Sequence, residues 1–299
     1  MARNNKIAAI TVTYHPDLQL LNQQIAELRD YMWIIFDNNS NYDELAKIED
    51  MIESRPFTYL IKNSENVGLA AAINMAIDFI SHQNVDIDFI LLLDQDSIPL
   101  GNSIELLKKA FCKLEKEGMP VGCVGPQLVD IQTGLQYGFH IINRGMWKRY
   151  FPENLNLTPL ECSSINGSGT FMRLDLFKKI GGLKGDFFID HIDTEWSFRV
   201  INCGYKLFGV PEAVFEHRMG ERSLSFWLLG WKFLPYRSPL RHYYLFRNNI
   251  SMLWYGYVPV TWKFWSIIKL IFTILVYIVF DRNRKQQLMS MFKGIKDGM

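Results

Sequence analysis

The sequence predicts an α/β fold in which a mainly parallel sheet is followed by a helical C-terminal region. Short apolar runs alternate with amphipathic segments over residues 1–125, which is the pattern of a doubly wound sheet. After Arg222, Trp, Tyr, Phe and Leu become frequent, with basic residues among them. We therefore divide the chain into an α/β domain, residues 1–222, and a helical region, residues 223–299.

The first three strands and helices are predicted from residue type and spacing. Residues 7–14 are apolar and β-branched, and Asp17 follows them as the cap of a helix whose apolar residues recur at helical spacing. The expected strands are residues 7–14, 33–36 and 57–61, and the expected helices are residues 18–28, 43–52 and 69–80. This alternation predicts parallel strands joined through helices.

Two acids follow the fourth predicted strand in the segment DFILLLDQDS, residues 88–97. Its unbroken apolar run is typical of a strand buried on both faces. Asp94 and Asp96 then lie at the C-terminal edge of the sheet, where open α/β sheets bind ligands and where carboxylates can hold a divalent cation. His217 ends a later apolar segment and could be a third ligand. The alternative interpretation is a solvated turn and an ordinary histidine.

Beyond this point the regular alternation ends. A helix at residues 103–116 and a strand at residues 121–124 are still expected, but residues 127–159 are irregular, with hairpin-like pieces. The segment Asn166-Gly167-Ser168-Gly169-Thr170 then forms a glycine turn before a helix at residues 174–180. Its glycines either allow a tight bend or shape a ligand pocket.

Three acids, Asp190, Asp193 and Glu195, precede or begin a further predicted helix. Acids at a helix start complement the helix dipole, which is a purely structural role. The functional alternative is that one carboxylate acts as a general base and another orients the acceptor of a reaction. The side chains expected to face inward from this helix are Trp196, Val200 and Cys203.

Composition and missing motifs exclude several classes of protein. A formal net charge of +1 argues against a general nucleic-acid binder. The first strand leads into Tyr14-His15-Pro16 and lacks the G-x-G-x-x-G turn of a dinucleotide site. The four cysteines form no C-x-x-C pair and are expected to be reduced and buried or nearly so. The N-terminus lacks a signal-peptide pattern, so we expect a cytoplasmic protein.

Eight segments, taken together and in order, resemble one enzyme family. They are TVTYHPD, FDNNS, NVGLAAAIN, LLLDQDS, NGSGTFM, FFIDHIDTEWSFRVINCGY, VFEH and YYLFRNN, spread over residues 7–250. The ordered set resembles the inverting glycosyltransferases of family 2, which have the GT-A fold. Within that family it is similar to bacterial rhamnosyltransferases of O-antigen and cell-surface polysaccharide synthesis.

The resemblance implies a donor half at about residues 1–125 and an acceptor half at about residues 126–222. It also implies that Mg²⁺ or Mn²⁺ is bound by Asp94, Asp96 and His217, with Asp96 the more direct carboxylate ligand. The donor-binding residues that it implies are Thr13, Tyr14, Asp37, Asn66, Gly68, Asn74, Asp94, Gln95 and Asp96.

On the acceptor side, the resemblance implies that Asp193 is the base that takes the proton from the acceptor hydroxyl. The common family pattern is Glu-Asp, whereas this chain has Ile192-Asp193 with Glu195 two residues later. Asp190 and Glu195 therefore stay open as alternative bases or orienting groups. Other residues expected here are Gly167, Ser168 and Gly169 for the acceptor. Arg241, Arg247 and Asn248 either bind the donor diphosphate, for which Arg247 is the first candidate, or pack the C-terminal helices onto the catalytic domain.

The activity implied is transfer of L-rhamnose from dTDP-β-L-rhamnose to a lipid-linked surface-polysaccharide acceptor. Close relatives use UDP-sugars, including galactofuranose, and the acids do not distinguish thymine from uracil. A nucleotidyltransferase would need a basic phosphate loop after the first strand, which TYHPD does not supply. The third hypothesis is a catalytically silent scaffold, or a nucleotide-sugar-binding module, in a polysaccharide assembly complex. The presence of all expected metal and base residues argues against it.

The segment TWKFWSIIKLIFTILVYIVF, residues 261–280, approaches the length of a transmembrane helix. Lys263 and Lys269 interrupt it, and on a helical wheel they share one side with Ser266, Thr273 and Tyr277. The pattern favours a helix lying in the membrane interface over a span or a buried helix. The expected anchors are Trp262 and Trp265, with Arg282, Arg284 and Lys285 at anionic headgroups. This placement predicts peripheral attachment to the cytoplasmic face of a bacterial inner membrane.

Overall fold

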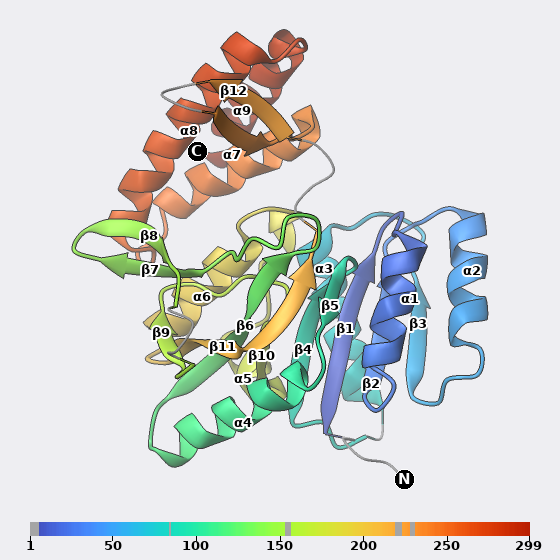
Figure 1. The fold of residues 1–299 in the computed structure, drawn as a ribbon. Helices are drawn as coiled ribbons and strands as arrows, with labels where there is room; N and C mark the ends of the chain where they lie inside the picture. The colour runs from blue at the N-terminus through green and yellow to red at the C-terminus, as the bar shows by residue number, and fades with distance from the viewer. Residues whose placement is uncertain (1–5, 84, 153–156, 219–222, 228–230) are drawn as a thin grey trace.

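The protein is built around one large twisted sheet (Figure 1). The computed structural model describes residues 6–83, 85–152, 157–218, 223–227 and 231–299. Within these ranges the sheet has nine strands in the order β3-β2-β1-β4-β10-β6-β11-β5, with β9 also paired to β11. Its strands are β1 (Ile7–Thr13), β2 (Met32–Asp37), β3 (Thr58–Lys62), β4 (Phe89–Asp94), β5 (Ser97–Pro99), β6 (Val121–Asp130), β9 (Leu160–Cys162), β10 (Phe171–Arg173) and β11 (Lys206–His217).

The sheet is mainly parallel, as the sequence predicts. Strands β1 to β4 pair in parallel, and so do β6 and β11. Strand β10 is inserted antiparallel between β4 and β6, while β5 and β9 pair antiparallel with β11. The strand expected at residues 121–124 extends to Asp130, because β11 continues to pair with it through Asp130.

Helices cover both faces of the sheet, and successive residues of β1 contribute to opposite sides. Ile7 and Ala9 pack with α1, α2 and α4, whereas Ala8 and Ile10 pack with α3, α5 and α6. The helices are α1 (Leu18–Glu27), α2 (Tyr42–Ile52), α3 (Leu69–His82), α4 (Ser103–Lys116), α5 (Leu174–Ile180) and α6 (Ile192–Asn202), with a 3₁₀ turn at Gly185–Phe187. Each predicted helix is thus confirmed within two residues at either end.

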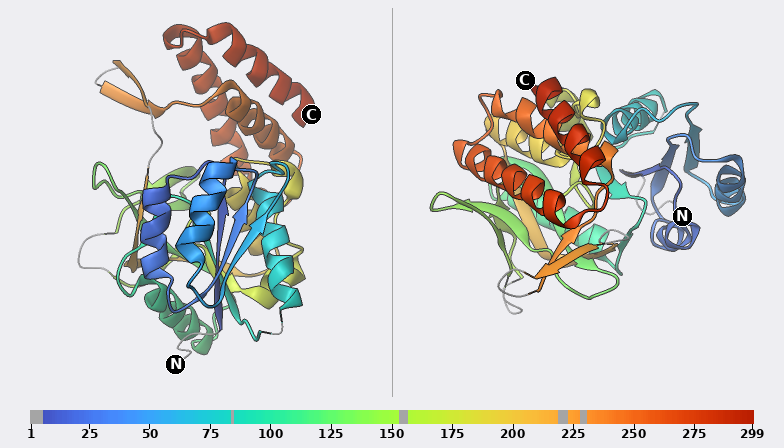
Figure 2. Two further views of the ribbon diagram at one scale, coloured as in Figure 1. Left: turned by 90° about the vertical axis from the view of Figure 1, so that its right-hand side faces the viewer. Right: turned by 90° about the horizontal axis from the view of Figure 1, so that it is seen from above.

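The C-terminal helices form a second, smaller unit beyond the C-terminal edge of the sheet (Figures 1 and 2). They are α7 (Pro239–Leu253), α8 (Val260–Phe280) and α9 (Arg284–Gly298). Two antiparallel hairpins lie outside the main sheet: β7 (Phe139–Asn143) with β8 (Met146–Tyr150), and β12 (Ser223–Trp227) with β13 (Trp231–Pro235). The unit has its own core around Phe246, Leu270 and Tyr277. Arg222, the predicted domain boundary, lies outside the described residues.

Helix α8 has an exposed apolar face and a buried face that carries most of its polar stripe. Among the described helices, it alone is long and apolar enough to cross a membrane by length and composition. Ser266, Thr273 and Tyr277 of the predicted polar stripe face the protein. The exposed apolar side chains are Val260, Phe264, Ile267, Ile268, Ile271, Phe272, Leu275, Ile278, Val279 and Phe280.

Two sequence predictions about buried and exposed side chains are wrong. Trp262 is only 4% exposed and packs edge-on against His191 and Phe198, so it joins α8 to the α/β unit and is not a membrane anchor. Trp265 is half-buried and donates from Nε1 to the carbonyl of Gly145 at 3.1 Å. Cys203, which was expected to face inward, is exposed at the C-cap position of α6. All four cysteines are free.

Candidate active site

A cavity of about 580 Å³ opens at the C-terminal edge of the sheet. The ends of β1 and β4 and the loop before α6 line it, and side chains around the start of α7 extend it. This is the edge where the topology of an open α/β sheet leaves room for a ligand. The predicted site residues in its wall are Tyr14, Asn66, Gly68, Asp94, Gln95, Asp96, Gly167, Asp190, Asp193 and His217.

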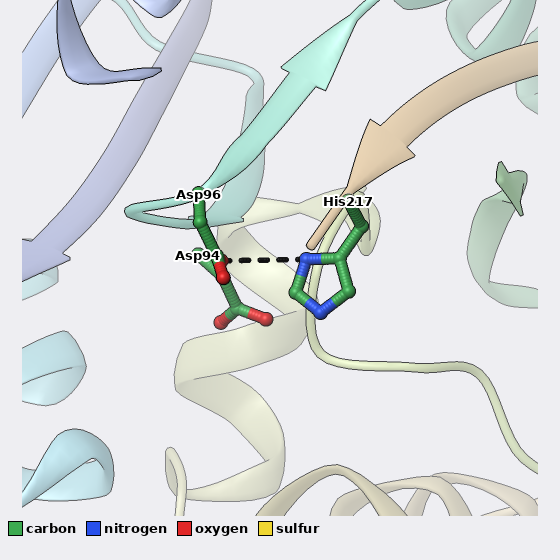
Figure 3. Close-up of side chains that lie close together, drawn as sticks. All are labelled: Asp94, Asp96 and His217. Atoms are coloured by element: carbon green, nitrogen blue, oxygen red, sulfur yellow. Dashed lines mark ion pairs between the residues drawn. The ribbon is translucent and has the colours of Figure 1, made fainter. Parts of the chain in front are cut away.

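Asp94 at the end of β4, Asp96 in the turn after it and His217 at the end of β11 lie close together in this cavity (Figure 3). One ligand atom of each lies within 4.8 Å of the others, and His217 Nδ1 is 3.4 Å from Asp96 Oδ1. The pairing of β5 with β11 places His217 directly opposite Ser97, which explains how residues so distant in sequence meet. Carboxylates are ligands that hard divalent cations prefer, and imidazole is a common ligand of transition metals, so the group can hold a divalent cation.

A buried network of polar side chains holds the turn that carries these acids. Gln24 of α1 donates from Nε2 to the carbonyls of Asp94 and Ser97, both at 2.6 Å, and accepts from the Thr11 hydroxyl. The Ser97 hydroxyl lies 2.7 Å from His217 Nδ1 and accepts from Ser168 Oγ at 2.5 Å. This network fixes the imidazole, as partners of metal-binding histidines do.

The sequence interpretation missed Gln24 and Ser97. The available signal was weak. Gln24 is a polar residue beside the apolar stripe of α1, and the structure leaves its side chain completely buried. A buried amide on an otherwise apolar face calls for a polar partner inside the fold, because burial without a hydrogen bond is costly.

The electrostatics of the site favour binding of positive charge. Burial raises the pKa of Asp94, and the neighbouring carboxylate of Asp96 raises it further, while His217 and Arg241 act in the opposite direction. Two acids crowded in this way gain from a shared cation, which relieves the repulsion between them.

Asp193 begins α6 and faces the same cavity. Its Oδ2 accepts from the backbone N–H of Gly167 at 3.3 Å, and its Oδ1 accepts from the N–H of Thr194 at 2.8 Å. Burial raises the pKa of Asp193 to about 6, helped by the charges of Asp94 and Asp190, against the effect of these two hydrogen bonds. A carboxyl group with a pKa close to neutrality is suited to accept a proton.

The two alternative acids have other partners. Glu195 is fully buried, forms a bidentate ion pair with Arg199 at 2.8 and 2.9 Å, and accepts from the Tyr257 hydroxyl at 2.6 Å. It does not line the cavity. Asp190 lines the cavity but is paired with Arg241 Nε at 3.2 Å. Asp193 therefore faces the cavity, Asp190 faces it while paired with Arg241, and Glu195 is held inside the fold by Arg199.

Several predicted donor and acceptor residues lie behind the cavity wall and do not line it. Asp37 is fully buried and accepts from Thr13 Oγ1 at 2.8 Å and from Ser40. Asn74 bonds to the backbone of Leu183 through both its amide atoms. The predicted residues absent from the wall are Thr13, Asp37, Asn74, Ser168, Gly169 and Glu195. Their hydrogen bonds join neighbouring loops and strands of the fold.

Arg247, the predicted diphosphate-binding residue, also lies outside the cavity wall. Its guanidinium donates to the side chain of Asn248 and to the carbonyl of Asp186. Three other arginines, Arg218, Arg237 and Arg241, line the cavity instead. Sequence periodicity could not separate them, because whether an arginine reaches the cavity depends on the tertiary contacts of the segments after β11 and at the start of α7.

Comparison with known proteins agrees with this geometry. The family model for glycosyl transferase family 2 matches residues 18–181. The chain is 29% identical over 304 residues to the dTDP-rhamnosyl transferase RfbF of Shigella flexneri, covering 98% of this chain and 96% of that protein.

Solved structures share the fold at low sequence identity. GalNAc-T7 with UDP, GalNAc and Mn²⁺ superposes with a TM-score of 0.63 at 15% identity, over 97% of this chain and 55% of that one, so this chain spans about half its length. The mannosyltransferase PcManGT of Pyrobaculum calidifontis, with GDP-Man and Mn²⁺, gives 0.56 at 13% identity, over 98% and 86%. S. aureus TarS 1-349 with UDP-GlcNAc gives 0.55 at 13%, over 98% and 82%. The chain belongs to glycosyl transferase family 2 and is a glycosyltransferase of the GT-A fold.

Proposed function

We propose that this enzyme transfers L-rhamnose from dTDP-β-L-rhamnose to a hydroxyl of a lipid-linked surface-polysaccharide acceptor, with inversion at the anomeric carbon. The observation that carries the proposal is that Asp94, Asp96, His217 and Asp193 all face one cavity at the sheet edge. The 29% identity to a dTDP-rhamnosyl transferase over nearly the whole chain supports the choice of donor.

The leaving group of this reaction is a nucleoside diphosphate, and the cavity has groups suited to bind it. A divalent cation, Mg²⁺ or Mn²⁺, held by Asp94, Asp96 and His217 would neutralise charge that develops on the diphosphate. Arg218, Arg237 and Arg241 line the same cavity and can add hydrogen bonds to phosphate oxygens. Tyr14, Asn66, Gly68 and Gln95 also line the cavity, and we assign them to the nucleotide.

On the acceptor side, Asp193 takes the proton of the attacking hydroxyl. Its carboxylate is held by two backbone N–H groups, so that it keeps one orientation while the acceptor approaches. Attack by that hydroxyl on the face opposite the leaving diphosphate inverts the anomeric centre in one displacement. Gly167, which donates one of these bonds, leaves space beside the carboxylate because it has no side chain.

A membrane-bound acceptor agrees with the C-terminal unit. Helix α8 exposes an apolar face. Helix α9 carries a surface depression lined by Arg284, Lys285, Phe292 and Lys293. An apolar face flanked by basic side chains is typical of helices that lie at an anionic bilayer surface. We therefore place the enzyme at the cytoplasmic face of the inner membrane, peripherally attached, where it meets its acceptor in two dimensions.

The test is calorimetric titration of the purified protein with dTDP-rhamnose and with UDP-sugars, each with Mn²⁺ or Mg²⁺ and with chelator. We expect cation-dependent binding of dTDP-rhamnose and at least tenfold weaker binding of UDP-sugars. Preference for a UDP-sugar would overturn the donor and retain the reaction class. Failure to bind any nucleotide sugar would favour the scaffold hypothesis.

A further inference from the structure

The loop that leads into α6, the helix that carries the proposed base Asp193, has an unusual backbone conformation. Phe188, Asp190 and His191 have φ angles of 31°, 65° and 63°. Residues with a Cβ atom rarely adopt positive φ, and a series of them persists only where surrounding contacts impose it. The loop ends at Asp193, so whatever imposes this conformation also sets the position of the proposed base.

One side chain of α7 bonds to much of this loop. Asn248 is completely buried, and its Nδ2 lies 3.0, 2.9 and 2.9 Å from the carbonyl oxygens of Phe187, Ile189 and Asp190. A buried amide group with three carbonyl acceptors around it is a strong local constraint, because loss of a buried donor is costly for the carbonyls that accept from it.

The neighbours of Asn248 fix the direction in which its amide points. Arg247 donates to Asn248 Oδ1 through Nε at 3.0 Å and Nη2 at 2.8 Å. Since a guanidinium only donates, Oδ1 must face it and the NH₂ group must face the loop. The same guanidinium lies over the Tyr244 ring at 4.8 Å, and Asn249 Nδ2 lies 3.4 Å from His191 Nε2.

We propose that Asn248 is a positioning residue for acceptor deprotonation, acting through the loop at residues 187–191 on Asp193. Arg247 serves it by orienting its amide. The C-terminal helices are then part of the catalytic machinery and do more than attach the enzyme to a membrane. This inference rests on the proposed function for the role of Asp193, but the contacts themselves do not depend on the donor.

The experiment compares Asn248→Asp and Asn248→Ala with the wild type. Asp has nearly the same shape but cannot donate to the three carbonyls, whereas Ala removes the amide. Asn202→Ala, at an exposed asparagine on α6, is the matched control. With whichever nucleotide sugar the wild type turns over, we expect kcat to fall about 100-fold, as small displacements of catalytic groups can cause. The KM and Kd for the donor should stay within threefold, because Asp94 ends β4 and Asp96 lies in the turn after it, outside the loop at residues 187–191.

A readout that needs no turnover separates this inference from the proposed function. Hydrogen exchange should speed up at least tenfold in peptides covering residues 187–193 of the Asp variant and stay unchanged at residues 89–97. If no donor binds the wild type, the proposed function fails while the exchange result still decides whether Asn248 holds the loop. A normal kcat in the Asn248 variants would overturn the positioning role. Unchanged hydrogen exchange at residues 187–193, with activity lost only in proportion to the loss of folded protein, would overturn it as well.

Discussion

The raised pKa of Asp193 makes a quantitative prediction about stability. A carboxyl whose pKa moves from 3.8 in the unfolded chain to about 6 in the fold binds its proton more tightly when folded. Keeping it ionised above pH 6 costs about 3 kcal/mol, at about 1.4 kcal/mol for each tenfold change. Because the side chain is only partly shielded from solvent, screening reduces the expected cost to about 1–2 kcal/mol.

The direction of the pH dependence follows from proton binding. Between pH 3.8 and 6 the folded state holds the proton and the unfolded state has lost it, so stability decreases as pH rises through this window. Asp193→Asn removes this charge and can keep the hydrogen bond from the Thr194 N–H. We therefore expect the variant to be about 1–2 kcal/mol more stable than the wild type at pH 8, with the difference shrinking between pH 6 and pH 4.

Thermal unfolding at a series of pH values measures this difference. For a chain of this size we expect a rise in Tm of about 2–4 °C at pH 8, together with loss of transfer and a donor Kd within a few-fold of wild type. Asp50→Asn, at an exposed position on α2, should show no such pH-dependent gain. A variant that gains no stability at pH 8, or one that keeps near-normal turnover, would refute the assignment of Asp193 as a desolvated base.

Three further predictions address the metal site, its support and the apolar face. Asp96→Asn should weaken cation-dependent donor binding at least tenfold in calorimetry and leave binding in chelator unchanged, whereas Asp50→Asn should alter neither. Gln24→Leu should lower the free energy of unfolding by about 3 kcal/mol in urea titrations, because two carbonyls and a hydroxyl lose their buried partner. Ile271→Asp should reduce co-sedimentation with anionic vesicles at least tenfold, while Ile201→Asp, at an exposed position on α6, should not.

The sequence predicted the sheet because its signals are local. Each buried strand is a short apolar run, and each covering helix has apolar residues at helical spacing, so neither assignment depends on contacts between distant segments. The same reasoning located Asp94 and Asp96, since acids that end a parallel strand must lie at the C-terminal edge. His217 was found because it ends an apolar segment, although only the β5–β11 pairing shows why it reaches the acids.

What the sequence could not predict depends on tertiary contacts. Glu195 and Asp193 are two residues apart on the same helix, yet one pairs with Arg199 inside the fold and the other faces the cavity. Trp262 has the residue type of a membrane anchor but packs on His191, because the docking of α8 turns it inward. Sequence periodicity predicts which side of a helix is buried, but it does not predict which residues that side contacts.

The predicted C-terminal appendage also contributes to the cavity, and the sequence patterns could not show this for the same reason. The family model ends at residue 181, before Asp193. The remaining residues supply His217 from β11, and the C-terminal unit adds Arg237 and Arg241 to the cavity and Asn248 to the loop before α6. If α8 rests on a bilayer, the helix that contacts lipid packs through Trp262 against the loop that orients the base. The same group of helices would then contact the membrane and support the proposed base. A lipid-linked hydroxyl would therefore reach Asp193 from the membrane side.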